Sequence, residues 1–336
     1  MKTPNRILTT LVGSLPRPET VVEQLFAQDS GLDYNEQTFD TLMKAEVLNV
    51  VAKQKASGVD VVSDGEMSKI SYATYIRHRL TGFEIGVMPR ATPKDLDDFP
   101  DFKERLAKLG ATPKYHRPIC TGPIAVKDLS GLHKDINNLK SACQASGVER
   151  GFMNSASPGV IAVFQPNQYY ANHEKYLNAL ADAMATEYEA IVASGLELQI
   201  DAPDLAMGRH IRFRDASDAE FMTAAEQQVE ALNHALRNVP ADRVRMHICW
   251  GNYEGPHHHD IELKRIIGLV CKAKPATILF EGANPRHAHE WEVWADAQKK
   301  GQLPDNKILC PGVLDSVNNF IEHPRLIAQR DRKSTR

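Results

Sequence analysis

The sequence lacks the features that mark membrane, secreted and nucleic-acid-binding proteins. No window approaches the roughly 20 apolar residues of a membrane-spanning helix. The opening stretch, MKTPNRILTTLVGS, contains no apolar run of signal-peptide length. The five cysteines are scattered and odd in number, which disfavours a disulfide framework and predicts a reducing, cytoplasmic location. The 40 basic and 43 acidic residues give a formal charge of −3, which indicates neither a nucleic-acid nor a membrane surface.

What the sequence does contain is a regular alternation of helical and strand-like segments. AEVLNVVAKQKASGVDVVSDGE (45–66) and ATEYEAIVASGLELQIDAP (185–203) each hold an amphipathic helix, a Ser-Gly stop, an apolar strand and an acidic strand end. Such helix-to-strand units build parallel sheets. Further strands are predicted around 7–16, 151–160, 243–252, 276–285 and 307–316, and helices at 36–57, 172–194, 217–237, 260–273 and 286–299.

This order predicts an α/β fold, a single TIM-type (β/α)8 barrel domain over residues 1–330. Residues 84–124 are interpreted as an insertion with a hairpin, because the charged, helix-poor part 84–114 interrupts the alternation. Seven barrel strands are counted, so we expect the eighth to be absent unless HRPICTGPI (116–124) supplies it. A missing strand exposes two sheet edges and predicts low solubility. The last residues, 331–336, are expected to be a non-native or disordered tail.

Polar residues follow the predicted strands at the ends that meet at the mouth of such a barrel. In RMHICWG (245–251), a strand would turn Met246, Ile248 and Trp250 to one face and His247 and Cys249 to the other. The remaining strand-end residues are Gly13, Ser14, Asp64, Glu66, Ser155 to Ser157, Asp201, Asp204, Glu281, Cys310 and Asp315.

His247, Cys249 and Glu281 form the candidate metal site. Zinc accepts imidazole, thiolate and carboxylate ligands together, and three protein ligands with one exchangeable position are typical of catalytic zinc. His-x-Cys alone is a weak signal, because such a pair is often only a polar spot in a core. Glu281 on the next strand end favours the metal interpretation.

The sequence resembles the C-terminal catalytic barrel of cobalamin-independent methionine synthases, and in length it resembles the short, single-barrel members of that family. Seven pieces carry the resemblance in family order across about residues 7 to 325: TTLVGSLPRP, VSDGEMSK, SPGVI, QIDAPDL, HIC, ILFEGA and PGVLDS. No single piece is decisive, whereas seven in order are a specific signal.

The resemblance implies a methyltransferase in which a zinc-bound homocysteine thiolate takes a methyl group from a methylated tetrahydrofolate, giving methionine. His247, Cys249 and Glu281 match the family's zinc ligands. Gly13 and Ser14 match the loop that holds the amino-acid carboxylate, and Glu66 and Asp201 match the acids that hold its ammonium group. The nucleophile belongs to the substrate, so no protein side chain is expected to act as one.

The sequence departs from the family pattern in ways that concern the methyl donor and the fourth zinc ligand. The family's last ligand is a cysteine on the eighth strand, beyond residue 336, and Cys310 is the alternative within this chain. Ser316, Val317, Asn318 and Asn319 stand where the family has a proton-handling histidine after the Asp of PGVLDS. The donor is therefore given as 5-methyltetrahydrofolate or a related compound.

Three alternatives remain open for the function. One is zinc-dependent alkyl transfer to another thiol, such as epoxide opening by coenzyme M, although paired acids at Glu66 and Asp201 suit an amino-acid thiol better. A second is a metal-free decarboxylase of the porphyrin-handling barrels, and a third is an inactive fragment. No nucleic-acid or membrane partner is expected.

Other histidines and basic residues are expected to have no special role. The tract His257 to His259 is interpreted as a loop, and His287 and His289 as a solvated turn. The basic cluster 209–214 is interpreted as a solvated loop, with a clamp for an anionic tail as the alternative.

Overall fold

The computed structural model describes residues 6–32, 34–86, 92–109, 118–252 and 254–334. The strands are β1 (Val61–Ser63), β2 (Phe83–Ile85), β3 (Pro118–Cys120), β4 (Arg150–Ala156), β5 (Glu197–Asp201), β6 (Val244–His247), β7 (Thr277–Glu281) and β8 (Ile308–Gly312). The α-helices are α1 (Glu19–Asp29), α2 (Glu36–Ala56), α3 (Pro100–Leu109), α4 (Ser130–Ala145), α5 (Pro158–Phe164), α6 (His173–Ala193), α7 (Asp218–Ala235), α8 (Leu263–Lys272), α9 (Trp291–Lys299) and α10 (Pro324–Ser334).

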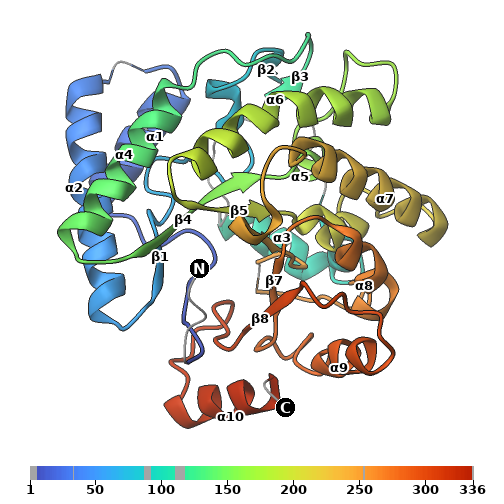
Figure 1. Cartoon of the computed structure of the whole chain (residues 1–336). Coiled ribbons are helices and arrows are strands. Elements are labelled where there is room, and N and C mark those ends of the chain that lie inside the picture. Colours follow the sequence, from blue (N-terminus) through green and yellow to red (C-terminus); the bar gives the residue numbers. More distant parts are fainter. Residues whose placement is uncertain (1–5, 33, 87–91, 110–117, 253, 335–336) are drawn as a thin grey trace.

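Six parallel strands form one curled sheet in the order β1-β4-β5-β6-β7-β8, with helices around its outer side (Figure 1). This arrangement confirms the predicted parallel barrel architecture. Within the described residues no strand joins β8 back to β1, as expected for a barrel without its eighth strand. The stretch HRPICTGPI does not fill this gap, because β3 pairs antiparallel with β2 in a separate sheet.

The first predicted strand is not regular, because side chains rather than a neighbouring strand hold its backbone. Among the described residues, a single parallel bridge, from Thr10 to Val61, connects it to the sheet. The Leu11 carbonyl accepts a hydrogen bond from Arg245 of β6 at 2.8 Å. The Val12 carbonyl accepts hydrogen bonds from the side-chain amides of Asn154 of β4 and Gln199 of β5. Hydrogen bonds from polar side chains inside the barrel therefore take the place of part of the expected backbone hydrogen bonds of this strand.

The five predicted helices match α2, α6, α7, α8 and α9 to within five residues at each end, whereas α1 and α4 were not predicted. Asn35 caps α2 through Thr38, and Asn172 caps α6 through Lys175. The prediction that 84–114 is poor in helix is wrong, because α3 occupies ten residues of it. Its many charges hid the i,i+4 spacing of its partly buried apolar residues, Phe102 and Leu106. Residues 331–334 of the predicted tail continue α10, and 335–336 lie outside the described residues.

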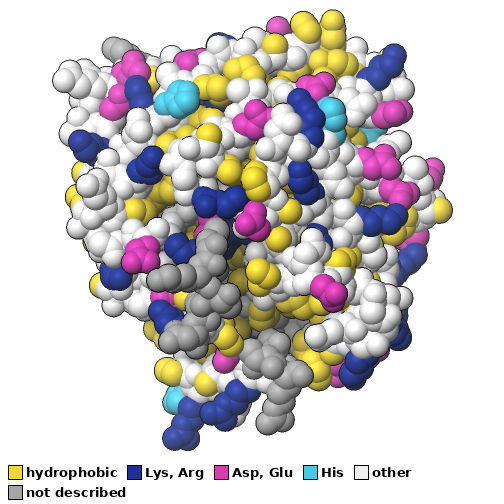
Figure 2. Space-filling view, in the orientation of Figure 1, with side chains coloured by type: hydrophobic (Ala, Val, Ile, Leu, Met, Phe, Trp, Pro, Cys, Tyr) yellow, Lys and Arg dark blue, Asp and Glu magenta, His cyan; other side chains and the backbone are white. Residues whose placement is uncertain are grey.

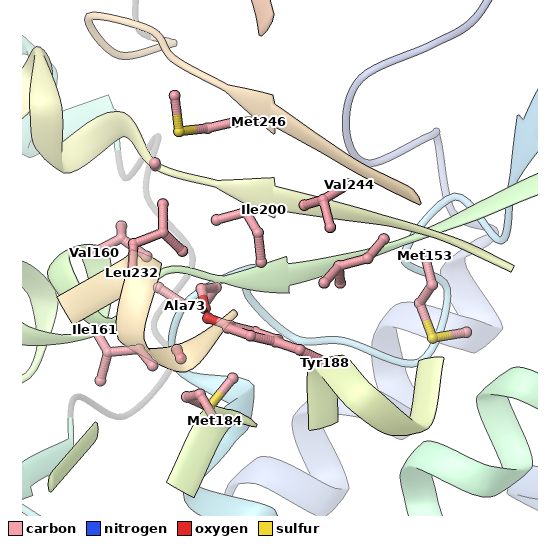
Figure 3. Packing of buried hydrophobic residues seen from close by; sticks show 14 of the residues in the cluster. Ala73, Met153, Val160, Ile161, Met184, Tyr188, Ile200, Leu232, Val244 and Met246 are labelled. Carbon is pink, nitrogen blue, oxygen red and sulfur yellow. Dashed lines mark hydrogen bonds between the residues drawn. The ribbon is translucent and has the colours of Figure 1, made fainter. Parts of the chain in front are cut away.

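The core lies between the sheet and its covering helices (Figure 3). Met153 of β4, Ile200 of β5 and Met246 of β6 belong to this cluster together with Met184 and Tyr188 of α6. The alternate residues on the same strands face the barrel interior, where the guanidinium of Arg245 lies 3.9 Å from the ring centroid of Phe152. The apolar face thus supplies the stability, and the polar face is left for a site.

Acidic and basic side chains are interspersed over the face seen in Figure 2, in keeping with the small net charge. Large apolar side chains are exposed near the end of the chain, among them Ile308, Leu314, Phe320 and Ile321. No helix within the described ranges is both long and apolar enough to cross a membrane.

The short helix α5 begins with Ser-Pro-Gly, and each of these residues has a physical reason. Ser157 caps the helix by accepting from the Val160 N–H and donates its own hydroxyl to Asp204 at 2.7 Å. Proline is favoured at the first helical position. A Cβ at Gly159 would overlap the buried Asp204 carboxyl and lie 2.9 Å from Cγ of Gln228. Glycine is therefore required at position 159 by space.

Replacing Gly159 with alanine should lower the free energy of unfolding by about 1–3 kcal/mol, the usual cost of overpacking. Gly268 in α8 offers a matched control, because a Cβ there meets nothing within 4 Å. Gly268→Ala should instead stabilise the protein by about 0.5–1 kcal/mol. Urea denaturation of both variants measures the difference, and stabilisation by both would contradict the packing argument.

Candidate active site

The predicted site residues lie at the carboxyl ends of parallel strands, which open on the same side of the sheet. Asp201 at the end of β5 is the register partner of His247 at the end of β6. Leu279 of β7 is the register partner of His247 of β6. Glu281 and Cys249 each follow these partners by two residues, so they lie on adjacent segments of the chain. The strand register therefore brings the predicted acids and soft ligands to one edge of the sheet.

Ser14 and Glu66 are in direct contact. The Ser14 hydroxyl donates a hydrogen bond to Oε2 of Glu66 at 2.6 Å, and a Cβ on Gly13 would lie 3.8 Å from Oε1. Glu66 is buried, with its backbone in the left-handed region at φ 57°. Burial and the nearby Asp201 raise the pKa of Glu66 to about 6. Lys69 and the Ser14 hydroxyl offset part of this effect, so the negative charge of Glu66 is disfavoured but not without support.

Asp201 is fixed by two amides that the sequence interpretation did not single out. Asn154 donates to Oδ2 at 3.0 Å and Gln199 donates to Oδ1 at 2.8 Å. The same two amides donate to the Val12 carbonyl, one residue before Gly13. Gln199 lies two residues before Asp201 on the same strand face, and Asn154 is a polar residue within a buried strand. Those two patterns are the signals that would have revealed them.

His247 and Cys249 face the site, as the alternation predicted. Met246, Ile248 and Trp250 are fully buried, whereas His247 and Cys249 are partly exposed. Nδ1 of His247 lies 3.4 Å from Oδ1 of Asp201. Burial lowers the pKa of His247, but Cys249 and Asp201 outweigh it and raise this pKa to about 10. The imidazole of His247 therefore interacts electrostatically with both the Cys249 thiol and the Asp201 carboxylate.

Glu281 is oriented by the segment after β6 and by its own loop. Its Oε1 accepts the Trp250 backbone N–H at 3.1 Å, and its Oε2 accepts the side chain of Asn284 at 2.8 Å. Two sets of three metal-type ligands in the described residues have their atoms within 4.8 Å of one another, and His247, Cys249 and Glu281 are not one of them. The assignment of this triad to a metal stays a prediction.

The histidines and the basic cluster have partners of their own. His287 is buried between Asp260 and Glu290, so its interpretation as a solvated turn is wrong. His257 is also buried, whereas His258 and His259 are more exposed and contact Asp98. In the basic cluster, Arg209 pairs with Asp218, Arg214 pairs with Asp97, and His210 is buried.

Taken together, the fold and the site define a parallel α/β barrel with acids and soft ligands at its strand ends. No family model matches the chain. It is 27% identical over 261 residues to a methionine synthase of Saccharolobus solfataricus, across 77% of this chain and 68% of that protein. It is 27% identical over 330 residues to a methionine synthase of Saccharolobus islandicus, across 97% of this chain and 82% of that protein. A methionine synthase of Sulfolobus acidocaldarius is 24% identical, and the match spans 65% of its length.

Solved structures agree with the fold. A B12-independent methionine synthase from Shewanella superposes with a TM-score of 0.67 at 17% identity, covering 97% of this chain and 85% of that one. A putative vitamin-B12-independent methionine synthase from Listeria monocytogenes gives a TM-score of 0.65 at 20% identity, covering 98% and 88%. The chain is thus similar in sequence to methionine synthases and shares the fold of solved B12-independent methionine synthases.

The raised pKa of Glu66 makes a testable statement about stability. Because its pKa rises from 4.5 in the unfolded chain to about 6 in the fold, the folded state binds the proton more tightly. Stability should therefore fall as the pH rises through this window. Glu66→Gln removes the effect and should stabilise the protein by about 2 kcal/mol at pH 7, with little change near pH 4. Thermal unfolding at several pH values measures this.

Glu23→Gln, at an exposed position, is the matched control for the loss of one carboxylate. A Glu66→Gln variant that is less stable than the parent at pH 7 would show that the carboxylate is held by favourable contacts.

Proposed function

We propose that this protein transfers a methyl group to the thiol of homocysteine and so forms methionine. The observation that carries the proposal is the close approach of an acidic side chain and a metal-type ligand at the carboxyl ends of two neighbouring strands. Asp201, beside Glu66, is an acid suited to an ammonium group, and it lies 3.4 Å from His247, a ligand suited to a thiol-binding metal. The relatives named methionine synthase support the same activity.

Glu66 and Asp201 would bind the ammonium group of the substrate. In the free protein Asp201 raises the pKa of Glu66, so the two acids disfavour each other's charge. An ammonium group placed between them replaces that repulsion with two attractions. The Ser14 hydroxyl and the backbone at Gly13 would hold the substrate carboxylate. The side-chain amides of Asn154 and Gln199, which donate to the Val12 carbonyl, keep this loop beside the acids.

His247, Cys249 and Glu281 would hold a zinc ion. Their imidazole, thiol and carboxylate groups are a ligand set that zinc accepts, and the hydrogen bonds to Glu281 fix its orientation in the way that supporting contacts orient metal ligands. A zinc ion held there lowers the pKa of a bound thiol, so that the thiol is nucleophilic at neutral pH. The nucleophile is the substrate's own sulfur, and the chain's residues bind and orient it.

The methyl donor is proposed to be 5-methyltetrahydrofolate or a related methylated compound. The resemblance to cobalamin-independent methionine synthases implies this class of donor, whereas the sequence has Ser316 to Asn319 where the family's proton-handling histidine is expected. Comparison of donors in a methionine-formation assay identifies the compound used.

Cys249→Ser should lower the bound zinc by about one equivalent per chain, because serine is a poor zinc ligand. Methionine formation from homocysteine and 5-methyltetrahydrofolate should be lost with it. Cys271→Ser, in α8, is the matched control and should keep both. Elemental analysis and mass spectrometry provide the readouts, and a Cys249→Ser protein with undiminished zinc would refute the ligand assignment.

Glu66→Gln should weaken homocysteine binding by about 1–3 kcal/mol, the scale of a lost hydrogen bond to a charged group. A simple alkyl thiol of similar size without an amine should bind nearly as before, because it makes no use of the acid. Calorimetric titration of both thiols on zinc-loaded protein separates the two effects. An equal loss for both thiols would mean that Glu66 has a structural role only.

A further inference from the structure

We propose that His210, His257 and Asp260 form a second binding site, for one divalent transition-metal ion, separate from the site formed by His247, Cys249 and Glu281. It does not depend on the methyl-transfer activity. His210 follows β5, and His257 and Asp260 follow β6, so the cluster lies in loops on the side of the barrel that carries the predicted active site. One ligand atom from each residue lies within 4.8 Å of the other two.

The three side chains already surround one another. Nδ1 of His210 lies 2.8 Å from Oδ1 of Asp260, and Nδ1 of His257 lies 2.9 Å from Oδ2. Ligand atoms bound tetrahedrally at 2.0–2.1 Å are about 3.3 Å apart, so an opening of about half an ångström would admit an ion. The two histidine side chains are fully buried and that of Asp260 is 5% exposed, which shields the group from water.

His210 supplies independent evidence that a ligand is needed. Both of its ring nitrogens are buried; Nδ1 is paired with Asp260, and Nε2 makes no hydrogen bond among the described residues. Buried polar atoms without partners are rare and costly, and an ion is one of the few groups that resolves them.

A supporting shell fixes the carboxylate. Nε2 of His287 lies 2.9 Å from Oδ2 of Asp260, and Nδ1 of His287 lies 2.9 Å from Glu290. The indole of Trp250 stacks on His287 at 3.9 Å between ring centroids. Carboxylate and histidine groups behind a first layer of ligands are the usual support of metal sites.

The ligand set selects the class of ion. Two imidazoles and one carboxylate are typical of Zn²⁺ and Fe²⁺ sites, whereas Mg²⁺ and Ca²⁺ prefer oxygen ligands alone. The loops after β5 and β6 would be joined by such an ion, and Trp250 connects them to Glu281 through its backbone N–H. The second ion would therefore stabilise the loops that frame the predicted active site.

Metal content in a set of variants tests the proposal. Each protein is loaded with Zn²⁺, dialysed and analysed for bound metal. Cys249→Ser should retain about one equivalent, and Cys249→Ser combined with His210→Gln should retain almost none. His259→Ala in the Cys249→Ser background is the matched control, because it removes a neighbouring, more exposed histidine and should leave the retained metal unchanged.

Cobalt substitution gives a second readout that needs no folded double variant. Co²⁺ bound to Cys249→Ser should show ligand-field absorption without a thiolate-to-cobalt band, because the proposed ligands contain no sulfur. A Cys249→Ser protein that retains no metal overturns the second site, as does loss of the metal in the His259→Ala control. If the predicted active site holds no metal, Cys249→Ser matches the parent while His210→Gln still removes the ion, so the two proposals fail separately.

Discussion

The side-chain amides of Asn154 and Gln199 hold the centre of this protein together. Each donates to the Val12 carbonyl and to the Asp201 carboxylate, so the first segment of the chain and the end of β5 are fixed to each other. Without these bonds a partly buried carbonyl and a buried carboxylate would both lose partners, which is costly away from water. The position of the Gly13–Ser14 loop relative to the acids follows from this one clamp.

Trp250 has a similar role on the other side of the site. Its backbone N–H fixes Glu281, its indole N–H donates to the Ile261 carbonyl, and its ring stacks on His287. Trp250, which is fully buried, therefore links the ends of β6 and β7 to His287 and, through it, to Asp260. The loops that carry the polar groups therefore share one buried apolar side chain.

The parallel architecture was predictable because apolar residues repeat differently in helices and in strands. Each helix-to-strand unit, such as 45–66 and 185–203, shows both repeats in turn. The alternation of RMHICWG likewise gave the correct faces for His247 and Trp250. The irregular first strand was not predictable, because its carbonyls are bound by side chains as far as 234 positions away, such as Arg245 on Leu11. The burial of the histidines at 257–259 was also not predictable. The three residues are identical, and only the fold buries His257 and leaves His258 and His259 more exposed.

The left-handed backbone at Glu66 has an evolutionary consequence. A side chain with a Cβ is strained there by about 1–2 kcal/mol, and glycine would relieve the strain. Selection for stability and selection for the carboxylate therefore act in opposite directions at a single codon. Among descendants of this protein, a glycine at position 66 would mark a lineage in which the need for that acid has ended.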